Sequence, residues 1–231
     1  MGDTLSASLK LFLQDLSSAD CHRGASVLRE CKAIELEAGV PRFTAEFAAD
    51  VLLLVEDGFA VVRATAEGSA RSVVTCEAGP GSVLLPPAAT EVLVGLGAAR
   101  LIVIGANARA ELLQIPALAG RLVEQLELTL RRKQEATANF AATRHIDRLG
   151  QKLLQLAEIY GHVARDGIRI DFPVSHALLA EMIGSSRETV TRAVDQLQRA
   201  GFLDRRGSTY RVLVSPESAF ASRDRRRPVP A

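Results

Sequence analysis

The sequence predicts an α+β protein, with a β-rich N-terminal half and a helical C-terminal half. Between residues 31 and 104, short runs of Val, Leu and Ile alternate with glycines, and no helical pattern separates them. Strands at such even spacing are typical of an antiparallel sandwich or barrel. From residue 117 onward, apolar residues instead recur at helical steps. We therefore expect an antiparallel β-roll of the jelly-roll type, followed by a long helix and a smaller helical domain.

Residues 5–30 carry apolar side chains at three- and four-residue steps, which predicts an N-terminal helix. The strands of the roll are expected in three segments, 51–68, 69–85 and 90–105. Glycines punctuate these segments where turns are needed. They are Gly58, Gly68, Gly79, Gly81, Gly95 and Gly97.

The long helix is predicted over residues 117–143 by an apolar stripe. Leu118, Leu122, Leu126 and Leu130 recur every four residues, and Phe140 lies near the end. A stripe of this length is typical of a helix that pairs with a partner helix, so these five residues are the predicted dimer interface. The alternative is that the stripe packs on the roll of its own chain.

A helix-turn-helix is predicted over residues 173–203. A first helix from Ser175 to Ile183 is followed by Gly184, which suits a tight turn because it tolerates positive φ. Ser186 is a good N-cap for the second helix. The inward positions of that helix are Val190, Val194 and Leu197.

The outward face of the second helix has the chemistry of DNA reading. Arginine suits a bidentate contact with guanine, and glutamate can accept a hydrogen bond from cytosine N4. The first turns of such a helix usually enter the major groove. The predicted DNA-binding residues are Ser186, Arg187, Glu188, Thr191 and Arg192.

The flanking segments predict a winged form of this domain. Residues 147–160 form an amphipathic helix, residues 168–172 a strand, and residues 202–214 a hairpin that turns at Gly207–Ser208. The domains are expected at 1–116, 117–145 for the long helix and hinge, 146–220 for the winged helix-turn-helix, and 221–231 for a basic disordered tail.

The charge distribution agrees with this division. Residues 1–140 hold 13 basic and 17 acidic side chains, whereas residues 141–231 hold 15 basic and 10 acidic ones. A basic C-terminal part favours contact with a polyanion there. No apolar run approaches the ~20 residues of a membrane helix, and the N-terminus has no basic leader with a cleavage site. We expect a cytoplasmic, nucleoid-associated protein that binds no membrane.

The order β-roll, long helix and winged helix-turn-helix, with the run GSSRETVTRAVDQL at 184–197, resembles the Crp/Fnr family of bacterial transcription regulators. The resemblance implies a homodimer and a double-stranded DNA operator with TGTGA-like, palindromic half-sites. It also implies RNA polymerase as a partner if the protein is an activator, and a cyclic-nucleotide-binding-like roll. In relatives with this motif, the positions of Arg187, Glu188 and Arg192 read base edges.

The effector site departs from the family pattern. The matching stretch is 79–92, where Pro87 and Ala88 replace the arginine and hydroxyl residue that hold the phosphate, and the Gly-Glu pair is absent. Without that arginine a phosphate loses charge-assisted bonds of roughly 1.5–3 kcal/mol each. We therefore expect another effector than cAMP, or none. The degenerate cleft is assigned to Gly79, Gly81, Val83, Leu84, Pro87, Ala88, Lys133 and Gln134.

No cofactor is predicted outright, although relatives that bind haem leave that alternative open. Haem needs a Cys or His axial ligand, and Cys21, His22 and Cys76 are the candidates in the N-terminal part. The three cysteines form no CxxC pair, so we predict no metal site. The hinge lacks the family's capping Asp and has Arg144 there, which favours a continuous helix.

The chain is not predicted to be an enzyme. It has no P-loop, HExxH or catalytic-triad pattern, and GLGAAR at 95–100 lacks the third glycine of a dinucleotide site. A cupin-like metal enzyme built on the roll is the rival from another class. Such an enzyme needs clustered histidines, and no histidine lies between residues 23 and 144.

Overall fold

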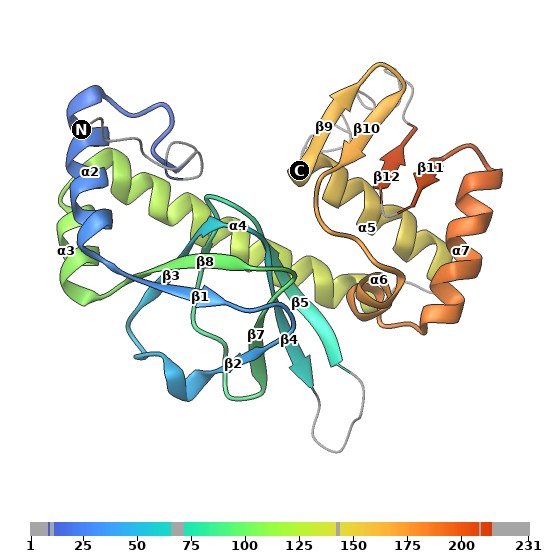
Figure 1. Ribbon diagram of the computed structural model, residues 1–231, viewed down its shortest axis with the longest axis horizontal. Coiled ribbons are helices and arrows are strands. Elements are labelled where there is room, and N and C mark those ends of the chain that lie inside the picture. Colours follow the sequence, from blue (N-terminus) through green and yellow to red (C-terminus); the bar gives the residue numbers. More distant parts are fainter. Residues whose placement is uncertain (1–8, 10–11, 66–71, 142–143, 208, 214–231) are drawn as a thin grey trace, which may run out of the picture. The chain divides into compact units, whose positions relative to one another are not determined.

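A computed structural model of the chain describes residues 9, 12–65, 72–141, 144–207 and 209–213 (Figure 1). The chain divides into two compact units, Met1–Asn139 and Phe140–Ala231, and each is described by itself. Ser208 and the predicted basic tail lie outside the described residues. Within the described ranges, no helix is both long and apolar enough to cross a membrane.

The first unit contains two four-stranded antiparallel sheets, which confirms the predicted β-roll. One sheet has the order β1 (Lys32–Leu36), β8 (Ala99–Ile104), β3 (Leu52–Asp57) and β6 (Val83–Leu84). The other has the order β2 (Pro41–Phe43), β7 (Glu91–Gly95), β4 (Ala60–Thr65) and β5 (Ser72–Ala78). A short 3-10 helix, η1 (Thr44–Glu46), follows β2.

Strand β3 shows how the roll is built, because its side chains alternate between two cores. Leu53 and Val55 pack with Val62, Leu93 and other residues from both sheets, so one core lies between the sheets. Leu52 and Leu54 belong to the second core, which the helices cover. The four side chains from Leu52 to Val55 are all buried, which explains why this part of β3 is continuously apolar.

Three helices pack against the outer face of the first sheet: α2 (Ser18–Glu30), α3 (Ala106–Leu113) and α4 (Pro116–Ala141). The prediction of one helix over 5–30 is wrong, because the chain breaks before α2. Asp15 has a φ of +64°, and Ser17 caps α2 by accepting a hydrogen bond from the Asp20 amide. A left-handed residue cannot continue an α-helix.

Helix α4 divides the predicted leucine stripe between two environments. Leu118 and Leu122 are 0% and 2% exposed and belong to the core under the helices, with Leu126 partly buried against it. The prediction that Leu118 and Leu122 form a dimer interface is therefore wrong, because the roll of the same chain needs them as cover. Leu130 is 58% exposed on another side of the helix. The side chain of Phe140 lies outside the described residues.

The second unit begins with α5 (His145–Tyr160) and the hairpin β9 (Gly161–Ala164) and β10 (Gly167–Ile170). Helices α6 (His176–Ile183) and α7 (Arg187–Arg199) follow, then the hairpin β11 (Leu203–Arg206) and β12 (Thr209–Val212). The four strands form one antiparallel sheet in the order β11-β12-β10-β9. This is the predicted winged helix-turn-helix, with β9 added to the strand expected at β10.

The hinge is not a continuous helix. Arg144 has extended backbone angles, φ −108° and ψ 128°, and stands at the N-cap position of α5. Its side chain makes no capping bond, although Asp147 in the first turn lies 3.8 Å from it and suits the positive end of the helix dipole. The residue type at the cap was therefore a poor guide to where the helix starts.

Candidate DNA interface and effector cleft

The turn between α6 and α7 has the local geometry that the sequence predicts. Gly184 has a φ of +59° and a ψ of +47°, a left-handed conformation in which a side chain would be strained. The Ser186 hydroxyl then accepts a hydrogen bond from the Thr189 amide at 3.2 Å and starts α7. The Ser186 side chain is thus occupied as a cap.

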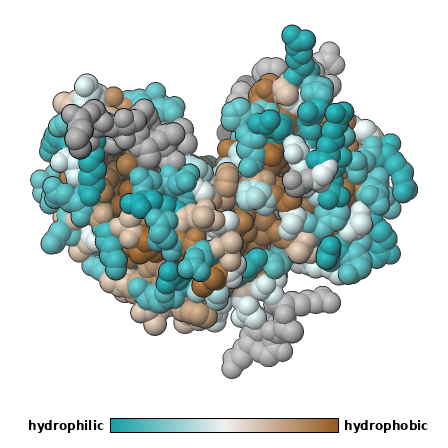
Figure 2. Space-filling model, viewed as in Figure 1, coloured by the Kyte–Doolittle hydropathy of each residue, from teal (hydrophilic) through white to brown (hydrophobic). Residues whose placement is uncertain are grey.

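Helix α7 has one buried and one exposed side. Val190, Ala193 and Val194 are buried, and Leu197 completes this face. On the other side, Arg187, Glu188 and Arg192 are exposed. Figure 2 shows a mainly hydrophilic surface in the region of α7. The helix therefore rests on its apolar face and presents its first two turns to solvent.

The exposed arginines in the first turns of α7 form no salt bridges with other described residues of the protein. In the part of the chain that the structure describes, no salt bridge involves Arg187 or Arg192. The pKa of Glu188 is lowered by hydrogen bonds from its own backbone amide and from the Ser186 hydroxyl, so this carboxylate is ionised at neutral pH. The two guanidinium groups and the Glu188 carboxylate are thus accessible to a binding partner.

Thr191 departs from the predicted outward arrangement. Its hydroxyl lies 3.0 Å from the Arg187 carbonyl oxygen and 2.8 Å from Nδ1 of His176. Both contacts are made within the domain, so the hydroxyl of this half-buried residue is already engaged by His176 and Arg187. The spacing of residues within α7 could not predict this contact, because His176 belongs to α6.

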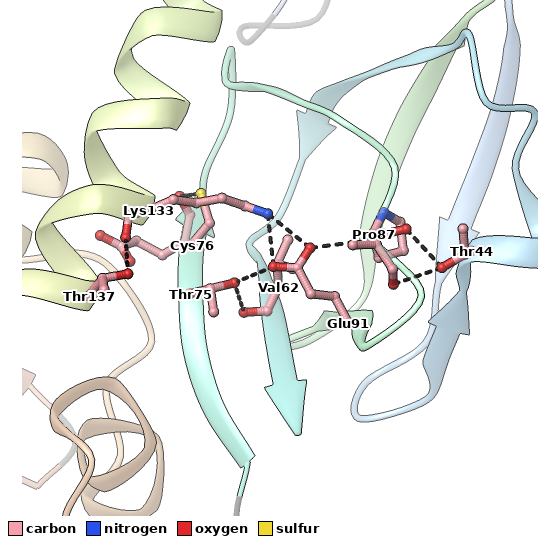
Figure 3. A network of polar contacts seen from close by, with 10 residues as sticks. Thr44, Val62, Thr75, Cys76, Pro87, Glu91, Lys133 and Thr137 are labelled. Atoms are coloured by element: carbon pink, nitrogen blue, oxygen red, sulfur yellow. Dashed lines mark hydrogen bonds and ion pairs between the residues drawn. The ribbon is translucent and has the colours of Figure 1, made fainter. Parts of the chain in front are cut away.

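The second polar site lies in the roll, around Glu91 at the start of β7 (Figure 3). Lys133 of α4 donates to both carboxylate oxygens, at 2.8 and 2.9 Å. The Ala88 amide donates at 3.1 Å, and the Thr75 hydroxyl at 3.0 Å. Glu91 is only 9% exposed, so a buried carboxylate is satisfied by donors from three parts of the same unit.

These donors keep Glu91 ionised. Burial of the carboxylate would raise its pKa, but hydrogen bonds from Lys133, Ala88 and Thr75, together with the Lys133 charge, outweigh it and lower the pKa. Glu91 and Lys133 therefore form a charged pair at neutral pH.

Further hydrogen bonds tie the same loop to its surroundings. The Thr44 hydroxyl lies 2.8 Å from the carbonyl oxygens of both Pro87 and Ala88. On α4, the Thr129 hydroxyl donates to the Val83 carbonyl at 2.7 Å, and Arg132 donates to the Glu77 carbonyl at 3.2 Å. The loop over 79–91 is thus anchored to α4 at several points.

The residues assigned to a degenerate cleft do not form one lining. Val83 and Leu84 are buried in two different cores, so they fill the protein rather than line a site. Gly79 and Gly81 form a turn, in which the Gly81 amide donates to the Val55 carbonyl at 2.9 Å. Two of the other assigned residues, Ala88 and Gln134, are exposed, and Pro87 is buried.

Lys133 and the Ala88 amide, two members of that set, both bind Glu91, a residue that the sequence analysis missed. A single acidic residue inside the apolar run VLLPPAATEVLVGL was the available signal, because an isolated buried charge requires a partner.

The candidate haem ligands are not brought together. Cys21 lies on α2 beside the helix-covered core, and His22 is exposed. Cys76 is fully buried in the core between the sheets. The described ranges contain no group of three or more His, Cys, Asp or Glu side chains arranged to hold a metal ion.

Comparison with known proteins agrees with this architecture. Residues 147–217 match the Crp-like helix-turn-helix domain family. The CRP-like cAMP-activated global transcriptional regulator of Mycobacterium tuberculosis is 29% identical over 110 residues, 48% of each chain. A global nitrogen regulator of Synechocystis sp. is 46% identical over 56 residues, 24% of this chain and 25% of that one. The chain thus matches about half or less of the length of these curated relatives.

Solved structures extend the likeness to the whole fold. A CooA mutant from Carboxydothermus hydrogenoformans has a TM-score of 0.72 at 16% identity, covering 96% of this chain and 97% of that one. A CRP family transcriptional regulator from Thermus thermophilus has a TM-score of 0.60 at 20% identity, covering 83% and 95%. At these identities the likeness concerns the fold alone.

Fold and recognition helix together define a winged helix-turn-helix protein with an N-terminal β-roll. Residues 147–217 match the Crp-like helix-turn-helix domain, and the chain as a whole has the fold of solved CRP family regulators. The curated relatives that the chain matches are named as regulators.

Proposed function

We propose that the chain is a homodimeric regulator that binds a TGTGA-like palindrome through α7. The observation that carries this proposal is that Arg187 and Arg192 are exposed beside the ionised Glu188 and form no salt bridge with any described residue. An arginine fork matches guanine O6 and N7, and a carboxylate accepts from cytosine N4. The buried face and the Ser186 cap hold the helix rigidly, so these side chains approach DNA from a fixed frame.

The outer side of α4 supports the homodimer. Val123 and Leu130 are 53% and 58% exposed and lie seven residues apart, which is two helical turns. Leu128 is also exposed. Exposed apolar side chains at heptad spacing are typical of a helix that pairs with a second copy. A two-fold dimer would present two recognition helices, and this symmetry calls for a palindromic operator.

The Glu91 network supports an effector other than cAMP, or none. The Lys133 ammonium and the Ala88 amide are donors that an anionic ligand could use, and both already bind the Glu91 carboxylate. A cyclic phosphate would have to displace this carboxylate or lie beside it with like charge. We therefore expect the protein to bind its operator without a cyclic nucleotide.

The test is binding to a TGTGA-N6-TCACA duplex and to a scrambled duplex at one fixed salt concentration, since phosphate contacts make affinity salt-dependent. Arg187→Ala and Arg192→Ala should each lose about 1–3 kcal/mol of discrimination. Arg199→Ala is the matched control, because Arg199 carries the same charge in the last turn of the same helix.

Equal affinity of the wild type for both duplexes contradicts the proposed specificity. Equal losses for Arg187→Ala and Arg199→Ala would mean that α7 contributes only unspecific charge. Transcription from a promoter that contains the operator then separates activation, with RNA polymerase as partner, from repression. Such a regulator would act in the cytoplasm, on the nucleoid.

A further inference from the structure

His176 connects three elements of the DNA-binding unit. It is the first residue of α6, and its Nδ1 lies 2.8 Å from the Thr191 hydroxyl of α7. Its ring meets the Tyr210 ring of β12 edge-on, with 6.4 Å between the centroids. The Arg205 guanidinium of β11 lies over the same tyrosine, 5.4 Å from its centroid. The histidine therefore stands where the first helix, the recognition helix and the wing meet.

The hydrogen bonds around Thr191 favour one tautomer of His176. The Thr191 hydroxyl has one proton, which it donates to the Arg187 carbonyl at 3.0 Å. It then accepts a hydrogen bond from a protonated Nδ1 of His176. Nε2 is buried and has no hydrogen-bond partner among the described residues, so it is best left unprotonated. The opposite tautomer would bury an N–H without an acceptor, which is costlier.

The surroundings of His176 also oppose a positive charge on the ring. Burial is the main cause that lowers the pKa of His176, and the charges of Arg205 on β11 and Arg187 on α7 lower it further. Asp195 of α7 acts in the opposite direction, and more weakly. Tyr210 makes a T-shaped ring contact with His176, and its buried hydroxyl has no hydrogen-bond partner among the described residues. Neutral histidine is thus the state that fits this position.

We propose that neutral His176 is a positioning residue for DNA recognition, because it holds the Thr191 hydroxyl and through it the Arg187 carbonyl. This inference rests on the proposed function and adds a residue that does not touch the bases. Thr191 lies between Arg187 and Arg192 along α7, so a fixed Thr191 fixes the first two turns on which both arginines stand.

A double-mutant cycle without DNA tests the contact. His176→Gln and Thr191→Val each remove one partner, and unfolding of both single variants and the double variant is compared with the wild type. We expect the effects to be non-additive by about threefold or more in the unfolding equilibrium constant. His176→Asn is the matched control, because its amide nitrogen takes the place of Nδ1. Additive effects would overturn the contact.

Discrimination between operator and scrambled duplex tests the positioning role, under conditions in which every variant is folded. His176→Gln and Thr191→Val should each lose about fivefold in discrimination, and His176→Asn should retain most of it. A purely structural histidine would change stability and leave the discrimination ratio unchanged, which would contradict the inference.

The two readouts separate this inference from the proposed function. If the wild type does not discriminate between the duplexes, the proposed function fails. The double-mutant cycle then still tests the contact between His176 and Thr191. If the wild type discriminates and the variants match it, the proposed function stands and the positioning role is wrong.

Discussion

The loop before β7 and the first turns of α7 use their charges in opposite ways. In the roll, the carboxylate of Glu91 is enclosed and bound by Lys133, Ala88 and Thr75. On α7, Arg187 and Arg192 are exposed and form no salt bridge in the described chain. A buried charge must be satisfied within the protein, whereas an exposed charge is hydrated and can bind a ligand. The charges around Glu91 are therefore satisfied inside the roll, whereas those of Arg187 and Arg192 remain at the surface of the second unit.

Helix α4 repeats this contrast within one element. Its inner leucines complete the core of the roll, and its outer apolar side chains stay exposed. Leu118→Ala and Leu130→Ala remove the same group from the two environments. Leu118→Ala should lower the free energy of unfolding of the first unit by about 3 kcal/mol, because it opens a cavity in a packed core. Leu130→Ala should change it by less than about 0.5 kcal/mol.

Chemical unfolding followed by far-UV circular dichroism measures both changes in the free energy of unfolding, and sedimentation measures self-association. Leu130→Ala should weaken self-association, since it removes a contact proposed between two copies. A large stability loss for Leu130→Ala, with unchanged association, would place Leu130 in the core of its own chain instead.

The Glu91–Lys133 pair offers the next effect in size. Glu91→Ala should cost about 2 kcal/mol of unfolding free energy, between the values for exposed and fully buried pairs, because it leaves Lys133 and the Ala88 amide unpartnered. Glu127→Ala is the control, since Glu127 lies on the exposed side of α4, 3.9 Å from Arg131. Equal, small effects of both variants would show that the loop is not held by Glu91.

Acidification should lower the stability of the two units at different pH values, and this effect is smaller. The pKa of His176 is lowered from 6.5, so below about pH 6.5 the unfolded chain binds a proton that the folded one refuses, and the second unit loses stability as pH falls. The pKa of Glu91 is lowered from 4.5, so its contribution is lost only below about pH 4.5. The second unit should therefore weaken at the higher pH.

Tyrosine fluorescence can follow this difference. The chain has no tryptophan, and both tyrosines, Tyr160 and Tyr210, belong to the second unit. His176→Asn should remove the loss between about pH 6.5 and the lowered pKa of the histidine. An unchanged acid profile in that variant would assign the loss to other groups.

The helix-turn-helix could be predicted from sequence because its signals are local. The turn requires a left-handed conformation, which Gly184 adopts, and Ser186 caps the helix that follows. Val190 and Val194 define the buried face of that helix. Each of these requirements involves neighbours only a few residues away. The predicted elements and their order were therefore confirmed.

The polar site of the roll could not be predicted in the same way, because its partners are distant in sequence. Glu91 meets Thr75 from β5 and Lys133 from α4, and only the folded roll brings them together. Likewise, spacing alone shows that Leu118 and Leu122 share a helix face, but not whether the roll or a second chain covers it. The break in the helix at Asp15 could not be predicted either, because no glycine or proline marks it in the sequence.

The most direct test of the contrast between a closed roll and an open recognition helix is operator affinity with and without cyclic nucleotides. The purified protein is titrated with the palindromic and scrambled duplexes at fixed salt, alone and with saturating cAMP or cGMP, and its absorbance spectrum is recorded to detect bound haem. We predict a colourless protein that discriminates between the duplexes equally well in all three conditions. Discrimination that appears only with cAMP would contradict the account, because it would show that the Glu91 network yields to an anionic effector.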